Sequence, residues 1–131
     1  ALLHDVGLAL ADGDINEASN QLTFDEKLLV EKHPYGLRNL DHSLCMEDDV
    51  RVAIEQHHEC WNGKGYPQRL RGEKIYYPAR ILHIADRFSQ LTTGWEGQDP
   101  FPPNMALFSM KQEGSFEPRL LEVFKGLFKA A

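Results

Sequence analysis

Six side chains carry imidazole or carboxylate groups at positions where metal ions could be bound. They stand at predicted helix ends or on faces shared with apolar residues, and they come from four separate segments. A carboxylate on a buried helical face is costly unless it is paired or bound to a metal. The candidates are His4, Asp5, His33, His57, His58 and Asp86.

A mixed imidazole and carboxylate set suits iron, manganese or zinc better than magnesium or calcium. A carboxylate such as that of Asp5 can bridge two ions. Two ions about 3.5–4 Å apart are the usual arrangement for in-line hydrolysis of a phosphoester, with hydroxide as the nucleophile. The residues therefore predict a binuclear metal hydrolase with a phosphate substrate.

Each of these signals also has an ordinary structural interpretation. A single histidine on an apolar helical face is more often a core residue than a ligand. Asp86 could form an ion pair with Arg80 or Arg87, and residues 62–67 could be a simple turn. The metal interpretation is favoured by the combination of all six residues and by none of them alone.

Composition excludes some classes of function. The chain has 131 residues, which fits one domain, and a net charge of −6. That charge argues against DNA or RNA binding, which needs a basic face, although bound metal ions could still attract a small phosphate ligand. No apolar run approaches eighteen residues, so we expect no membrane insertion in this segment. Cys45 and Cys60 form no paired motif, which suits a reducing cytoplasm.

The periodicity of apolar residues predicts an all-α fold with almost no strand pattern. Thr23 and Glu26 form a capping box that should begin a helix. The helix that begins near Asp48 has an apolar stripe that continues into His57 and His58. We expect loops at 6–22, 62–67 and 94–103, and helices at 1–5 (a last turn), 23–32, 34–44, 48–58, 78–93, 104–112 and 118–129. The core face of the last helix should consist of Leu120, Leu121, Phe124, Leu127 and Phe128.

Two motifs resemble those of a known family. The segment that contains His4 and Asp5 resembles the HD signature, and residues 57–67 (HHECWNGKGYP) resemble the HHExxDGxGYP signature of the HD-GYP family. Further segments agree in order and spacing: residues 22–26, His33-Pro34 with Leu40, residues 79–86 and residues 114–118. The resemblance implies an HD-type helical bundle with a buried multinuclear metal site. Residues 1–131 would be the HD-GYP core without its first helix or helices, which would lie upstream of residue 1.

The resemblance also implies roles for the candidate residues. The family's metal ligands fall on all six of them, with Asp5 and His4 as the catalytic pair. It implies two or three divalent ions, with iron expected first and manganese or zinc as alternatives. The family uses one more histidine, from a helix before the HD pair, and that position lies outside this chain. His42 and His83 match no ligand position and are interpreted as ordinary helical histidines.

Three positions depart from the family pattern. Leu8 stands where the family usually has a lysine, and Trp95 lies where the family has an Arg-Pro-Tyr-Arg run. Both changes remove groups that resemble phosphate contacts, and loss of one such group typically costs about 10²–10³ in rate. Asn62 replaces an aspartate and keeps its hydrogen-bonding capacity.

The first hypothesis for function is a phosphodiesterase that hydrolyses cyclic di-GMP to linear diguanylate or GMP. The alternative is a degenerate module that binds metal and nucleotide, or a signalling partner such as a GGDEF-type protein, without efficient turnover. A third is an HD phosphohydrolase for another nucleotide. The substrate or partner would meet the GYP loop, defined here by Lys64, Gly65, Tyr66, Pro67 and Arg69.

Overall fold

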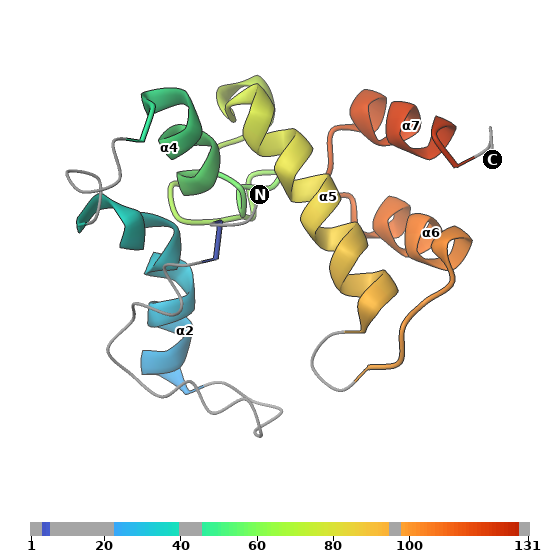
Figure 1. Ribbon diagram of the computed structural model, residues 1–131, viewed down its shortest axis with the longest axis horizontal. Coiled ribbons are helices and arrows are strands. Elements are labelled where there is room, and N and C mark those ends of the chain that lie inside the picture. The colour runs from blue at the N-terminus through green and yellow to red at the C-terminus, as the bar shows by residue number, and fades with distance from the viewer. Residues whose placement is uncertain (1–3, 6–22, 40–45, 95–97, 129–131) are drawn as a thin grey trace.

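The computed structural model describes residues 4–5, 23–39, 46–94 and 98–128, and the regular secondary structure within these ranges is entirely helical (Figure 1). Expectations for Leu8, His42, Cys45, Trp95 and the loop 6–22 lie outside the described residues. The described elements are α2 (Phe24–Lys32), η1 (His33–Asn39), α4 (Asp48–Glu55), η2 (Gly72–Lys74), α5 (Tyr77–Thr93), α6 (Pro103–Glu113) and α7 (Pro118–Gly126). The all-α fold class is confirmed.

The start of α2 follows the capping box predicted from the sequence. The Glu26 amide donates to Thr23 Oγ1 (3.3 Å), and the Thr23 amide donates to Glu26 Oε2 (2.6 Å). The two reciprocal bonds satisfy backbone donors that the first turn of a helix leaves free. After α2 the chain tightens into the 3₁₀-helix η1, so the α-helix expected from Pro34 onward is wrong over the residues described.

Helix α4 ends earlier than its apolar stripe predicted. The last helical residue is Glu55, and residues 56–58 form a turn, so the expected continuation of the helix through His57 and His58 is wrong. The Tyr76 amide donates to Gln56 Oε1 (2.7 Å) and thereby ties this turn to the start of α5. His57 and His58 consequently lie in a turn that is held between the end of α4 and the start of α5.

Helix α5 is the central element of the fold. It has 17 residues, with Pro78 in its first turn, and it packs against α4 and α6. Figure 1 shows α5 as a long diagonal, with α4 and α2 on one side and α6 and α7 on the other. No helix in the described ranges is both long and apolar enough to cross a membrane.

The hydrophobic core lies between α5, α6 and α7. Its buried members are Ile84, Leu91, Ala106, Met110, Phe116 and Leu121, with Phe88, Leu120 and Phe124 packed against them. The last helix was expected to run to residue 129, but α7 ends at Gly126 and Leu127, an expected core residue, is 66% exposed. Phe128 packs on Phe88 as expected, with ring centroids 4.9 Å apart. The core therefore fixes the C-terminal half of α5 against α6 and leaves its other face available to the histidine turn.

Candidate metal centre

His57 is fixed by the turn in which α4 ends. Its side chain is fully buried, and its Nδ1 donates to the carbonyl oxygen of Ile54 at 2.6 Å. Because a carbonyl can only accept, this bond places a proton on Nδ1. The ring is thereby held so that Nε2 faces the neighbouring candidate residues, which is the orientation of a histidine that ligates a metal through Nε2.

His33 is oriented in the same way at the end of α2. Its Nδ1 donates to the carbonyl oxygen of Val30 at 2.6 Å, and its side chain is 1% exposed. Its Nε2, like that of His57, is buried without a hydrogen bond. Two buried ring nitrogens without hydrogen bonds are costly in a folded protein unless another group satisfies them.

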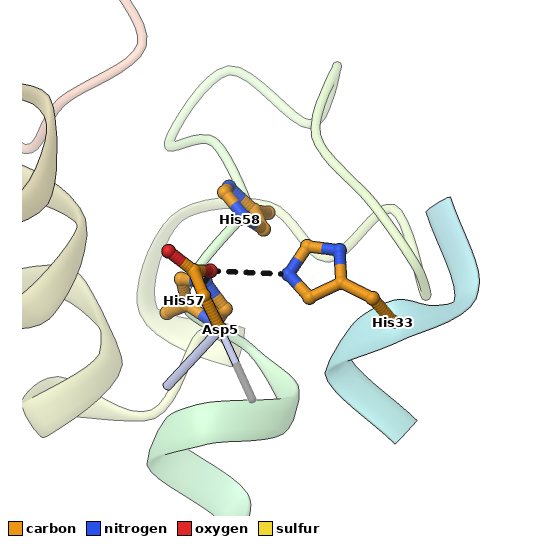
Figure 2. Close-up of side chains that lie close together, drawn as sticks. All are labelled: Asp5, His33, His57 and His58. Carbon is orange, nitrogen blue, oxygen red and sulfur yellow. Dashed lines mark ion pairs between the residues drawn. The ribbon is translucent and has the colours of Figure 1, made fainter. Parts of the chain in front are cut away.

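Asp5 brings these histidines together (Figure 2). Its Oδ1 lies 3.3 Å from His33 Nε2 and 3.4 Å from His57 Nε2. Burial alone would raise the pKa of the Asp5 carboxyl, but the surrounding imidazoles of His33, His4 and His57 hold that pKa far below its ordinary value. Asp5 is therefore ionised over the whole physiological range, as a metal-binding carboxylate must be.

His58 completes this first group of donors. Its ring centroid lies 3.9 Å from that of His57 and 4.9 Å from that of His33. Burial, with smaller contributions from the two neighbouring histidines, lowers the pKa of His58 to about 2. The imidazole is neutral at pH 7 and can offer a lone pair. Tyr66 stacks on its outer face at 4.8 Å.

A second group forms around the other oxygen of Asp5. His4 Nε2 lies 2.9 Å from Asp5 Oδ2 and 3.2 Å from Asp86 Oδ1. The Asp86 side chain is 12% exposed. The sequence had left open an ion pair between Asp86 and Arg80 or Arg87, and this alternative is wrong. Those arginines instead pair with Glu117 and Glu113, respectively.

The two groups fit divalent metal ions. In each group, one donor atom per residue lies within 4.8 Å of all the others, and Asp5 belongs to both. The first group is Asp5, His33, His57 and His58, and the second is His4, Asp5 and Asp86. The buried, unsatisfied Nε2 atoms of His33 and His57 supply the physical reason for a cation there. All six candidate residues thus converge, whereas His83 belongs to neither group and packs on Phe116.

The GYP loop is held in place by the buried carboxylate of Glu59. Its Oε1 accepts from the Gln68 amide (2.6 Å), and its Oε2 accepts from the Leu70 amide (2.8 Å). The loop thereby places Tyr66 against His58, while the side chains of Lys64 and Arg69 are exposed. Among the predicted substrate or partner residues, Tyr66 is therefore the one whose side-chain ring packs on a candidate ligand ring.

Asn62 also anchors this loop. Its Nδ2 donates to the Gly114 carbonyl (3.1 Å), and its Oδ1 accepts from the Lys64 amide (3.0 Å). An aspartate could accept from Lys64 but could not donate to Gly114. The departure from the family pattern thus adds a bond between the loop and the segment after α6.

Replacement of Glu59 by glutamine should destabilise the protein by about 1–3 kcal/mol, because one of the two backbone donors would face an NH₂ group. Urea unfolding in the presence of a chelator measures this loss apart from any metal contribution. Glu73→Gln, an exposed change in the same segment, should shift stability by less than about 0.5 kcal/mol. Equal effects of the two substitutions would contradict a clamping role for Glu59.

Sequence reasoning missed two residues that organise the centre. Glu59 was noticed only as a letter in a motif, and Gln90 received no role. Gln90 follows Asp86 by four residues on α5 and donates to it at 2.8 Å. Spacing of four residues on a helix was the available signal for this contact.

Comparison with known proteins gives a consistent pattern. A family model described as HD domain matches residues 1–120. The chain is 36% identical over 125 residues to the 3'3'-cGAMP-specific phosphodiesterase 2 of Vibrio cholerae, covering 92% of this chain and 24% of the relative. It is 31% identical over 127 residues to the cyclic di-GMP phosphodiesterase response regulator RpfG of Xanthomonas campestris, covering 93% and 33%.

A cyclic di-GMP phosphodiesterase of Thermotoga maritima is 28% identical over 134 residues, covering 98% of this chain and 36% of the relative. The chain therefore spans about a quarter to a third of the length of these relatives. In all three cases the matched part includes nearly the whole chain.

Proposed function

Because the chain belongs to the HD domain family, we propose that it is the core of a metal-dependent phosphodiesterase that cleaves a cyclic dinucleotide. The observation that carries the proposal is the position of Asp5, whose two oxygens face two separate groups of donors. A shared carboxylate of this kind suits two ions close together, and such pairs serve phosphoester hydrolysis. Iron is the first expectation for these ions, with manganese or zinc as alternatives.

The residues of the centre have distinct tasks in this proposal. Bound divalent ions would supply an acidified water and positive charge near the phosphate. Asp5, which stays ionised, contributes one oxygen to each of the two groups of donors. Neutral His58 offers a lone pair without prior loss of a proton. Burial raises the pKa of the Tyr66 hydroxyl, so this group remains a hydrogen-bond donor at the rim of the centre.

The substrate class rests on the relatives. Their names specify cyclic di-GMP or 3'3'-cGAMP, and both are cyclic dinucleotides with two phosphodiester bonds. The degenerate alternative is disfavoured because the matched relatives are named as phosphodiesterases. None of these names supports a GGDEF-type partner.

A turnover assay tests the proposal directly. The full-length protein would be loaded anaerobically with Fe(II), or with Mn(II), and incubated with each cyclic dinucleotide before chromatography of the products. We expect linear dinucleotide or mononucleotide from at least one substrate, and none above background from Asp5→Asn. A metal-loaded wild-type protein that leaves both nucleotides intact would refute the proposed activity.

A further inference from the structure

Gln90 contacts a member of the metal centre without being a ligand itself. It lies on α5 one turn after Asp86, and its Nε2 donates to Asp86 Oδ2 at 2.8 Å. Asp86 Oδ1 lies 3.2 Å from His4 Nε2. The two oxygens of Asp86 are therefore divided, with one held by Gln90 and the other directed into the centre.

The Gln90 amide is itself held in one orientation. Its Oε1 accepts from Arg87 Nη1 at 3.4 Å, and Arg87 donates through Nη2 (2.9 Å) and Nε (3.1 Å) to Glu113 Oε1 on α6. Because guanidinium groups only donate, the amide oxygen must face Arg87 and the NH₂ group must face Asp86. A continuous polar chain thus runs from α6 through Arg87 and Gln90 to the carboxylate.

The strengths of these contacts are unequal. The bond between Gln90 and Asp86 is short and ends on a carboxylate, which makes it the stronger kind of hydrogen bond. The bond between Arg87 and Gln90 is long, so Arg87 biases the amide orientation more weakly. Loss of Gln90 should consequently have the larger effect on Asp86.

We propose that Gln90 is a positioning residue that holds the Asp86 carboxylate in the orientation required for metal binding, with Arg87 and Glu113 behind it. This inference rests on the proposed metal centre. Outer-shell hydrogen bonds of this kind typically contribute about 10–100-fold to metal affinity. Because the role concerns metal binding, a change at Gln90 should alter metal affinity even when no substrate is present.

The test is a titration of the full-length protein with Co(II), followed by visible absorption and by competition with a chromophoric chelator. Gln90→Met keeps a similar volume but has no donor. It should weaken the site that contains Asp86 by about 10–100-fold and alter its absorption bands. Gln98→Met makes the same change in a cavity of about 130 Å³ that Gln90 also lines, and it should leave both readouts as in the wild type.

A second variant keeps the inference testable if Gln90→Met fails to fold. Arg87→Leu removes the anchor but leaves the amide, so it should weaken the same site by a smaller factor. The double variant should lose no more than Gln90→Met alone, because both act through one contact. If Gln90→Met bound Co(II) with the affinity and spectrum of the wild type, the positioning role of Gln90 would be overturned. The same result in Arg87→Leu would overturn it if only that variant folds. Absence of Co(II) binding in the wild type would instead overturn the metal centre itself.

Discussion

Asp5→Asn is expected to abolish binding of both proposed metal ions. Among the residues that the structure describes, the Asp5 carboxylate is the one group that belongs to both sets of donors, with Oδ2 2.9 Å from His4 and Oδ1 3.3 Å from His33. An amide has the same shape but is neutral, and its NH₂ group cannot bind a cation. The loss of affinity should exceed the roughly 10–100-fold effect that removal of an outer-shell partner produces. Metal content measured by mass spectrometry after gel filtration would report it.

Asp86→Asn is the matched control for this prediction. Asp86 belongs only to the group with His4, so its loss should remove one ion and leave the ion bound by the three histidines and Asp5. Circular dichroism of both metal-free variants would show that the helices are intact. If Asp5→Asn retained two ions, or if both variants lost the same number, Asp5 would not be the shared ligand.

The parts of the fold that could be predicted from the sequence are those that depend on residues close together along the chain. The capping box of Thr23 and Glu26 is a local arrangement, and it appears in the structure as predicted. The end of α4 could not be predicted in this way. On a continuing helix, adjacent side chains point about 100° apart, which would separate the rings of His57 and His58. The chain leaves the helix at Glu55, and the two rings then lie 3.9 Å apart.

The candidate site likewise combines residues that sequence motifs could identify with contacts between distant residues that they could not. The motifs indicated six candidate residues that the structure brings together, but the sequence could not show what holds them in place. Arg80 and Arg87 could each have paired with Asp86, and only the packing of α5 against the C-terminal segments engages them with Glu117 and Glu113. Such pairings join residues 37 and 26 positions apart, which no local spacing rule predicts.

The close approach of the GYP loop to the histidine turn is a second feature that sequence alone did not show. Gly65 is buried, and a Cβ atom placed on it would lie 2.3 Å from both the carbonyl oxygen of His58 and the amide nitrogen of Cys60. These are backbone atoms, so they cannot rotate away as a side chain could. The loop lies against the turn only because residue 65 has no side chain.

Gly65→Ala is therefore expected to destabilise the protein by about 3 kcal/mol or more, at the upper end of the cost of overpacking. It should also displace His58, because the backbone of residues 58–60 must move by about 1 Å to restore ordinary contact distances. Urea unfolding of the metal-free protein measures the first effect, and Co(II) affinity at a urea concentration where the variant stays folded measures the second.

Gly126→Ala separates this steric effect from the general consequences of adding a methyl group. Gly126 is the last residue of α7, and apart from its chain neighbours and the backbone of its own helix, no atom lies within 4 Å of the position that its Cβ would take. Alanine there should be neutral or stabilising by up to about 1 kcal/mol, since it restricts the unfolded chain. A Gly65→Ala protein as stable as wild type would mean that the loop can move away from the turn. In that case His58 would owe its position to something other than the packed glycine.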